Sequence, residues 1–212
     1  MISGLLDCKR RAEFEQSAQF SATRTPQCQN SGEVGALGRP RYSRCVTSPS
    51  IRQLESADYD RIEPVVDEWW GGRPVRGLLQ RLFFEHFGPM SFFVGSDAAV
   101  EAFLIGFRSQ SHPGLGYIHF VGVRPDLRGR GLGRLLYERF FEAARSSGCA
   151  EVQCITSPHN AQSVGFHRRM GFELLPGAAE VNGFPVSPNH AGPGQARVVF
   201  RKQLSNEFAT GP

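Results

Sequence analysis

A run of glycines between a strand-like segment and a long amphipathic helix is the feature that most constrains this chain. Residues 117–123 alternate as a half-buried strand does, Pro125 interrupts the pattern, and Gly129, Gly131 and Gly133 lead into the helix. The first turn of a helix leaves its N–H groups unpaired, and the peptide dipoles place partial positive charge there. Because glycine has no Cβ, the backbone can approach a ligand closely, so we predict an anion-binding turn.

Spacing excludes two other phosphate-binding loops. A P-loop needs Gly-Lys followed by Ser or Thr, and that tripeptide does not occur in this sequence. The dinucleotide fingerprint Gly-x-Gly-x-x-Gly also fails, because Arg134 stands where the third glycine is needed. The turn must therefore belong to another class of phosphate-binding site.

Two elements resemble the coenzyme A segments of the GNAT acetyltransferase superfamily. The pattern Arg/Gln-x-x-Gly-x-Gly/Ala is met by Arg128, Gly131 and Gly133. Residues 160–172 are similar to the second element, Asn-x-x-Ala/Ser, then Phe-Tyr, then Gly-Phe. The resemblance covers residues 51–204. It implies an α/β (α+β) fold in which about four helices flank a mixed, partly splayed central sheet.

The resemblance also implies acetyl-CoA as co-substrate and assigns residues to it. The backbone of Val121 and Val123 would bind the pantetheine arm in the splay of the sheet. The remaining implied coenzyme-binding residues are Arg128, Gly129, Arg130, Gly131, Leu132, Gly133, Arg134, Asn160 and Ser163.

His167 is a candidate catalytic acid, because the superfamily usually places Tyr where this chain has His167. Asn160, Ser163 and His167 follow i, i+3, i+7 spacing and share one helical face. An imidazolium, with an ordinary pKa of about 6.5, can also donate a proton. The alternative is that His167 only caps or lines the coenzyme channel.

His119 is a candidate base, with Tyr117 further along the same strand. Strand alternation predicts that Tyr117, His119, Val121 and Val123 point to one face, so His119 would look into the acceptor cleft. The alternative is that both rings simply pack.

The acceptor side has two candidate segments. Trp69 and Trp70 could stack on a cationic or ring-bearing acceptor while Asp67 or Glu68 attracts its ammonium group. The alternative is that one of the two tryptophans is core and that the acids are a solvated helix face. The second candidate is residues 176–195, a segment rich in Pro, Gly and Asn that we expect to form a lid or mobile loop.

Periodicity and turn residues predict the order of the elements. Helices are expected at 56–70, with Ser56 as N-cap, after Pro74 up to residue 87, and at 132–147 and 160–170. Strands are expected at 51–54, 91–94, 100–110, 114–123, 151–156, 172–175 and 197–202.

Charge and composition divide the chain unevenly. The formal net charge of the chain is +4 and its pI is about 9.0, but residues 1–45 hold seven basic and four acidic side chains and so carry most of that charge. The rest of the chain is nearly neutral, which disfavours a nucleic-acid partner. Residues 1–45 lack periodicity, and we expect a disordered extension. A bolder hypothesis holds that they are not native and that Val46 derives from an alternative start codon. Residues 46–212 are expected to form one acetyltransferase domain.

The five cysteines show no metal-ligand spacing, so no metal is expected. Apolar runs fall short of the ~20 residues that span a bilayer, and no secretory signal is visible. We therefore expect a cytoplasmic protein without a membrane partner. A C-terminal edge strand could pair two copies as a homodimer.

Together these features predict an N-acetyltransferase that moves acetyl from acetyl-CoA to a primary amine of a small molecule or peptide by direct attack. Cys149 and Cys154 give little support to a covalent route, because neither has a neighbouring base in the sequence and both are expected to pack. Two alternatives stay open. One is a non-catalytic acyl-CoA binding or sensing module, and the other is a transferase that modifies aminoacyl-tRNA and would need a basic surface.

Overall fold

Short strands and helices alternate through the part of the chain that the computed structural model describes, residues 50–96 and 98–204. The expectations for residues 1–45 lie outside the described residues. The strands are β1 (Ile51–Gln53), β2 (Phe92–Ser96), β3 (Ala99–Arg108), β4 (Leu115–Val123), β5 (Glu151–Thr156), β6 (Glu173–Leu174), β7 (Ala179–Val181), β8 (Phe184–Val186) and β9 (Val198–Gln203). The α-helices are α1 (Tyr59–Ile62), α2 (Val66–Trp69), α3 (Leu82–His86), α4 (Leu132–Ser146) and α5 (Ala161–Arg169).

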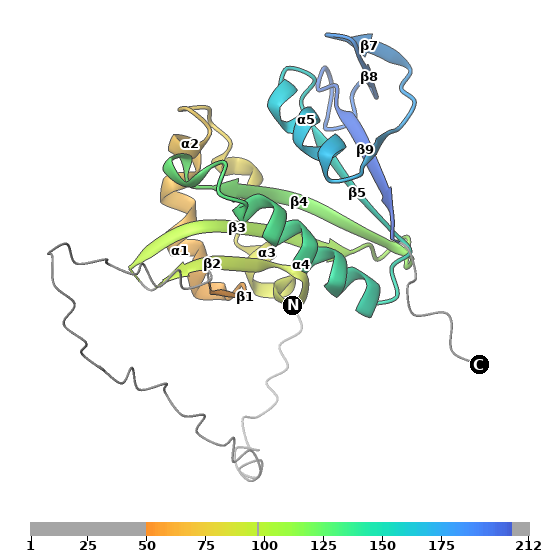
Figure 1. The fold of residues 1–212 in the computed structure, drawn as a ribbon. Coiled ribbons are helices and arrows are strands. Elements are labelled where there is room, and N and C mark those ends of the chain that lie inside the picture. The colour runs from red at the N-terminus through yellow and green to blue at the C-terminus, as the bar shows by residue number, and fades with distance from the viewer. Residues whose placement is uncertain (1–49, 97, 205–212) are drawn as a thin grey trace, which may run out of the picture. The chain divides into compact units, whose positions relative to one another are not determined.

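Seven strands form one mixed sheet in the order β1-β2-β3-β4-β5-β9-β6 (Figure 1). β4 and β5 are parallel, and the other neighbours are antiparallel. The parallel pair is connected through α4, since parallel neighbours need a long crossover. β7 and β8 pair separately.

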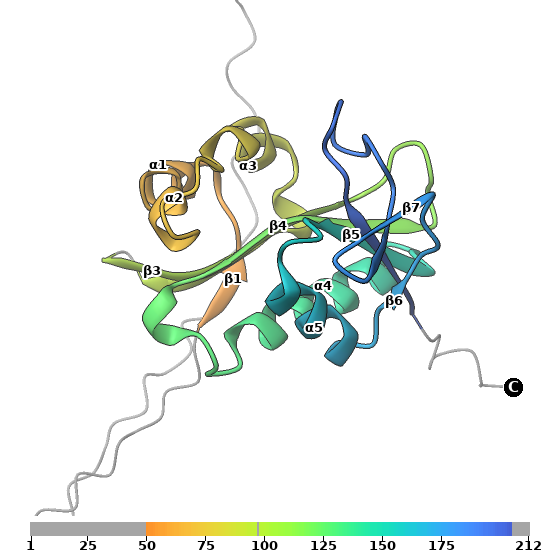
Figure 2. The same cartoon turned by 90° about the horizontal axis from the view of Figure 1, so that it is seen from above.

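Helices cover both faces of the sheet (Figure 2). α1, α2 and α3 lie on one face, where Ile62, Val66 and Phe103 are fully buried. α4 and α5 lie on the other face, where Leu136 and Phe140 of α4 are fully buried. The predicted mixed, flanked sheet is confirmed, and each of its faces has its own apolar core.

The sheet forks between β4 and β5. Their pairing runs from Leu115 with Glu151 to Ile118 with Cys154, and β5 then diverges from β4 together with β9 (Figure 1). The partly splayed sheet predicted from the sequence is therefore present. His119 is the first residue of β4 beyond the last pair.

A β-bulge in β4 coincides with this fork. Ile105 pairs with Phe120, but the next residue, Gly106, pairs with Ile118, so His119 is the extra residue on its strand. An extra residue reverses the alternation of side chains on either side of it.

The prediction that four side chains of β4 share one face is therefore wrong. The rings of Tyr117 and His119 contact aromatic rings of β3 and α3, on the face that α1–α3 cover. Val121 and Val123 instead pack against the core under α4 and α5.

The predicted helix over residues 56–70 is interrupted. It comprises 3-10 turns at Ser56–Asp58 and Glu63–Val65 and the single-turn helices α1 and α2. Pro64 lies at the break, where it cannot donate an intrahelical hydrogen bond. Glu55, not Ser56, occupies the N-cap position, and the Ser56 hydroxyl donates to Glu85 at 2.5 Å. The second predicted helix is reduced to α3, with 3-10 turns at Arg76–Leu78 and Gly88–Met90 on either side.

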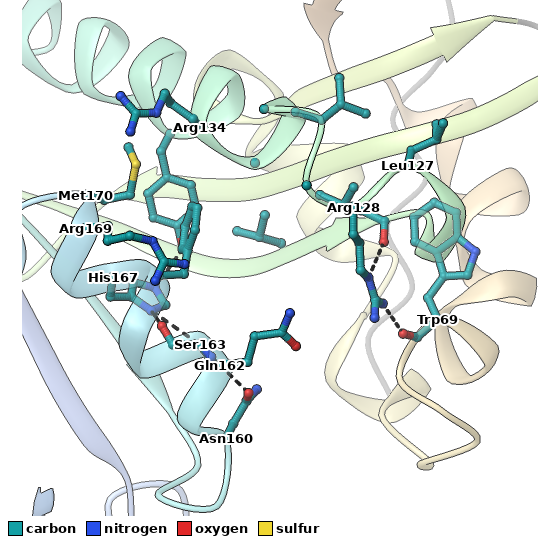
Figure 3. A pocket seen from close by; sticks show the side chains of 18 of the residues that line it. Trp69, Leu127, Arg128, Arg134, Asn160, Gln162, Ser163, His167, Arg169 and Met170 are labelled. Atoms are coloured by element: carbon teal, nitrogen blue, oxygen red, sulfur yellow. Dashed lines mark hydrogen bonds between the residues drawn. The ribbon is translucent and has the colours of Figure 1, made fainter.

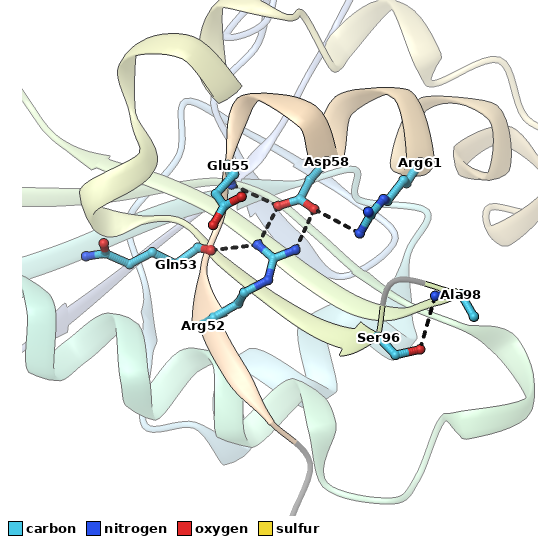
Figure 4. A network of polar contacts seen from close by, with 7 residues as sticks. All are labelled: Arg52, Gln53, Glu55, Asp58, Arg61, Ser96 and Ala98. Atoms are coloured by element: carbon cyan, nitrogen blue, oxygen red, sulfur yellow. Dashed lines mark hydrogen bonds and ion pairs between the residues drawn. The ribbon is translucent and has the colours of Figure 1, made fainter. Parts of the chain in front are cut away.

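Asp58 ties β1 to this helical segment (Figure 4). Its carboxylate, 1% exposed as a residue, accepts two hydrogen bonds of 2.7 Å from the Arg52 guanidinium and one of 2.8 Å from the Glu55 N–H. Arg61 lies 3.8 Å away. A buried carboxylate is tolerated here because charged and backbone donors surround it.

Residues 176–195, expected as a lid or mobile loop, instead contain the β7–β8 hairpin. Asn182 and Gly183 form its turn with φ of 54° and 75°, as a two-residue hairpin turn requires. The Asn182 amide donates to His159 Nδ1 at 2.9 Å, and Val186 is fully buried. The hairpin is thus packed onto the loop that precedes α5.

Candidate active site

A pocket of about 650 Å³ lies between the glycine turn, α4, α5 and the end of α2 (Figure 3). The predicted residues that line it are Trp69, Trp70, Val121, Val123, Arg128, Gly129, Gly131, Leu132, Gly133, Arg134, Asn160, Ser163 and His167. Four predicted site residues do not line it, namely Glu68, Tyr117, His119 and Arg130. Lining residues that the sequence reasoning missed include Arg73, Tyr137, Gln162, Phe166 and Arg169.

The glycine turn presents a row of unpaired N–H groups. Gly129 and Gly131 have φ of 78° and 88°, which L side chains rarely adopt. Within the described ranges, no backbone N–H from residue 129 to residue 134 has a hydrogen-bond acceptor. These donors converge at the start of α4, whose dipole also favours an anion. The turn therefore fits a phosphate or diphosphate.

Every charged side chain that lines the pocket is an arginine. Arg73, Arg128, Arg134 and Arg169 line it, and none of the lining residues is acidic. Arginine matches phosphate oxygens with paired donors and keeps its charge at any physiological pH. The pocket therefore suits a ligand with several negative charges and lacks a partner for an ammonium group.

The Arg128 side chain is engaged by the protein itself. Its Nε donates to the Val123 carbonyl at 3.2 Å, and its Nη2 donates to the Trp69 carbonyl (Figure 3). Arg128, one of the predicted phosphate contacts, thus links the end of β4 to the end of α2.

The two tryptophans occupy different environments. Trp69 is 5% exposed and belongs to the core under α1–α3. Trp70 is half-buried and lines the pocket, and its ring lies tilted against Phe120 with the ring centroids 4.8 Å apart. Glu68 is exposed outside the pocket. The substrate-binding roles of these three residues stay predictions.

His167 is held in the core by hydrogen bonds at both ring nitrogens. Its Nδ1 lies 2.7 Å from the Ser163 carbonyl and its Nε2 lies 2.8 Å from the Tyr137 hydroxyl. The ring is 5% exposed and stacks on Phe200 at 4.5 Å. Burial lowers the pKa of His167 below 6.5, so the neutral form dominates near pH 7. Asn160 caps this helix by accepting the Ser163 N–H at 3.1 Å.

His119 lies on the opposite face of the sheet, at the fork. Its Nε2 donates to the Leu78 carbonyl at 2.9 Å, and its ring stacks on Phe83 at 4.3 Å. Burial lowers the pKa of His119, which leaves the ring neutral near pH 7. Burial also raises the pKa of Tyr117 to about 12, so that hydroxyl keeps its proton.

The described part of the chain contains no group of three or more His, Cys, Asp or Glu side chains placed to hold a metal ion. Among the same residues, none of the helices combines the length and apolar character that crossing a bilayer requires.

Comparisons with known proteins agree with this geometry. A model of the acetyltransferase (GNAT) family matches residues 49–172, more than half of the chain. The chain is 28% identical over 146 residues to a mycothiol acetyltransferase from Gordonia bronchialis, a match that covers 64% of this chain and 47% of that protein. It is 32% identical over 142 residues to an L-methionine sulfoximine/L-methionine sulfone acetyltransferase from Pseudomonas aeruginosa, covering 60% and 81% respectively.

A solved structure shares the fold. The GNAT superfamily phosphinothricin acetyltransferase from Sinorhizobium meliloti, in complex with AcCoA, superposes with a TM-score of 0.55 at 19% identity, covering 77% of this chain and 92% of that one. The chain spans about half the length of the mycothiol acetyltransferase that it matches. As its glycine turn and its second coenzyme A element predicted, the chain belongs to the acetyltransferase (GNAT) family.

Proposed function

We propose that this chain transfers an acetyl group from acetyl-CoA to the primary amine of a small molecule by direct attack. The observation that carries this proposal is the fork between β4 and β5. The arginine-lined pocket lies on the α4 and α5 face beside it, and His119 lies on the other face at the same point of β4. A donor and an acceptor bound on opposite faces would meet through the fork.

Acetyl-CoA would bind along the pocket with its diphosphate at the glycine turn. The unpaired N–H groups of residues 129–134 would hold the diphosphate oxygens, and Arg134 would add charge at the rim. Val121 and Val123 line the pocket where β4 has lost its β5 partner, so their backbone would bind the pantetheine arm. Support comes from the pocket itself, which offers donors and positive charge and no acid.

His119 would act as the base that prepares the amine. A protonated amine is not a nucleophile, so a neutral acceptor for its proton is required. Since the Leu78 carbonyl can only accept, Nε2 carries the hydrogen and Nδ1 keeps a free lone pair. The lowered pKa keeps that lone pair available at neutral pH. Holding amine and thioester together would supply much of the remaining rate enhancement.

The acceptor is proposed to be a small molecule, because the two relatives at 28% and 32% identity are named for small molecules. The Trp70 ring packs against Phe120 on the α1–α3 face and also lines the pocket, so we propose that it lies between the acceptor and the donor. The buried thiols of Cys149 and Cys154 are free, which suits a reducing compartment such as the cytoplasm.

The test is to incubate the full chain with acetyl-CoA and a panel of amino acids, alkylamines and N-terminal peptides, following thiol release. We expect turnover with at least one small amine. Tight coenzyme binding without turnover on any amine would overturn the proposal in favour of a non-catalytic acyl-CoA module. Turnover confined to aminoacyl-tRNA, included as a separate arm, would overturn the small-molecule assignment.

A further inference from the structure

Tyr137 on α4 reaches across to His167 on α5 inside the pocket. The Tyr137 hydroxyl lies 2.8 Å from His167 Nε2, and both residues are buried, at 3% and 5% exposed. Both also line the pocket, with Val121 and Val123. Tyr137 therefore places a phenol in the same pocket as the strand proposed to hold pantetheine.

Hydrogen-bond chemistry decides which of the two groups can give up a proton. The Ser163 carbonyl can only accept, so at 2.7 Å it fixes the hydrogen of neutral His167 on Nδ1. Nε2 is then an acceptor and takes its hydrogen bond from the Tyr137 hydroxyl. In this state His167 has no hydrogen to offer a ligand, and Tyr137 is the proton-bearing member of the pair.

We propose that Tyr137 is a further catalytic residue, whose hydroxyl protonates the coenzyme A sulfur as it leaves, and that His167 is a positioning residue that acts through Tyr137. This inference rests on the proposed acetyl transfer. The amine nitrogen bonds to the acetyl carbon, and the carbon–sulfur bond breaks with its electron pair on sulfur. The Tyr137 hydroxyl turns its hydrogen from His167 to the sulfur and gives up that proton. The phenolate takes its proton back from water after the coenzyme departs.

The surroundings of His167 allow it to stabilise the phenolate. The Ser163 carbonyl holds the ring hydrogen on Nδ1, so a proton that Nε2 takes up from water faces the Tyr137 oxygen. Nε2–H then donates to the phenolate oxygen. Nε2 passes this proton to the phenolate and returns to its resting state, and the ring is kept in place by its stack on Phe200.

Other groups fit this role less well. Tyr117 is a phenol on the opposite face of the sheet, in contact with Phe107. The four lining arginines do not release a proton in proteins. Burial raises the pKa of Tyr137 well above 10, so its proton is in place at every pH at which the reaction is assayed.

The decisive experiment removes the Tyr137 hydroxyl by substitution and the coenzyme A sulfur by use of an analogue. Calorimetry compares wild type and Tyr137→Phe with coenzyme A and with desulfo-coenzyme A, which lacks the sulfur. We expect the substitution to weaken coenzyme A about fivefold to tenfold, the effect of one lost hydrogen bond, and to leave desulfo-coenzyme A unchanged. With a turned-over amine, kcat should fall about 100-fold to 10,000-fold while the KM for acetyl-CoA stays within about twofold.

Two further variants separate a catalytic role from a structural one. Tyr59→Phe removes a phenol from the half-buried α1 residue that packs edge-on to Phe84, and should change neither affinity nor kcat. His167→Gln, whose amide can still hold the phenol, should retain more activity than Tyr137→Phe. If His167→Gln abolishes turnover while Tyr137→Phe retains it, His167 is the acid and the proposal is wrong.

Equal weakening of coenzyme A and desulfo-coenzyme A by Tyr137→Phe would assign Tyr137 a structural role and overturn the proposal. If wild type binds neither ligand, the proposed acetyl transfer itself fails, which is a different result. A measurement on wild type guards against a misfolded variant. The ultraviolet difference spectrum of tyrosine should respond to coenzyme A and not to desulfo-coenzyme A, and an identical response to both would contradict the contact.

Discussion

His119 is held by the main chain of Leu78, whose carbonyl oxygen accepts a hydrogen bond from the His119 Nε2 at 2.9 Å. This contact fixes the ring at the bulge of β4 and directs the hydrogen to one nitrogen. Leu78 belongs to a 3-10 turn of the segment that follows α2, so the orientation of the proposed base depends on the segment that covers this face.

We expect His119→Gln to lower kcat about 100-fold to 10,000-fold, because the amide can still donate to Leu78 but takes up no proton. Wild-type activity should fall on the acid side below pH 6.5, where His119 becomes protonated, since burial lowers its pKa. That acid limb should be absent in the variant. Steady-state thiol release across pH measures both effects, and calorimetry should give an unchanged acetyl-CoA affinity. A wild-type rate in the variant would remove His119 from the mechanism.

The stability of the protein should rise with pH through the histidine range. Burial lowers the pKa of His167, so between its folded and unfolded pKa values the unfolded state binds more protons. The contribution of His167 to stability is therefore complete above about pH 6.5 and is lost as pH falls through the folded pKa. Urea unfolding between about pH 5 and pH 8 should show this slope.

His167→Gln should make that dependence shallower, because glutamine does not titrate, and should leave the share that comes from His119, whose pKa burial also lowers. His190→Gln, at an exposed position, should leave the slope as it is. An identical slope in wild type and His167→Gln would show that other groups cause the pH dependence.

Gly131→Ala should separate stability from ligand binding. Gly131 has φ of 88°, and Gly148, just after α4, has φ of 77°, with open space around both. Alanine at either position should cost about 1–2 kcal/mol in the free energy of unfolding, because a Cβ is strained in this conformation. Only Gly131→Ala should weaken coenzyme A, about tenfold or more for one lost charge-assisted hydrogen bond. Calorimetry checks this, and equal affinity in both variants would place the diphosphate elsewhere.

Asp58→Ala should destabilise the fold by about 3 kcal/mol, because it leaves the Arg52 guanidinium and the Glu55 N–H without their buried acceptor. This loss lies at the lower end of the range for a broken buried ion pair, because the Arg52 side chain is 36% exposed. Asp60→Ala breaks the exposed pair with Arg81 and should cost less than about 1 kcal/mol. Chemical denaturation of both variants makes the comparison, and similar losses would contradict the special position of Asp58.

Much of the fold could be predicted from local pattern. The apolar stripe of α4, the Gly148 cap and the hairpin of β2 and β3 follow directly from periodicity and turn residues. Two local signals were available and missed. Pro64 divides the first helical segment, and Asn182-Gly183 is a hairpin turn within the supposed loop.

The site could be predicted less well from the sequence, because its geometry depends on strand register and on contacts between residues far apart in the chain. Alternation in β4 places His119 with Val121 only if the strand is regular, and the bulge is decided by pairing with β3. Tyr137 and His167 are 30 residues apart on different helices. The one available signal is that Tyr137 lies one turn beyond Gly133, on the same face of α4.

Because of the fork in the sheet, the melting temperature of the protein should report how well it binds an acyl donor. Beyond Ile118, β4 has no strand neighbour on its β5 side among residues 50–96 and 98–204, so a ligand lying there supplies contacts that the chain alone lacks. Anything that binds only the folded state raises the melting temperature with concentration. Melting curves with acetyl, butyryl and longer thioesters would therefore rank the acyl groups that the protein accepts before any acceptor amine is known.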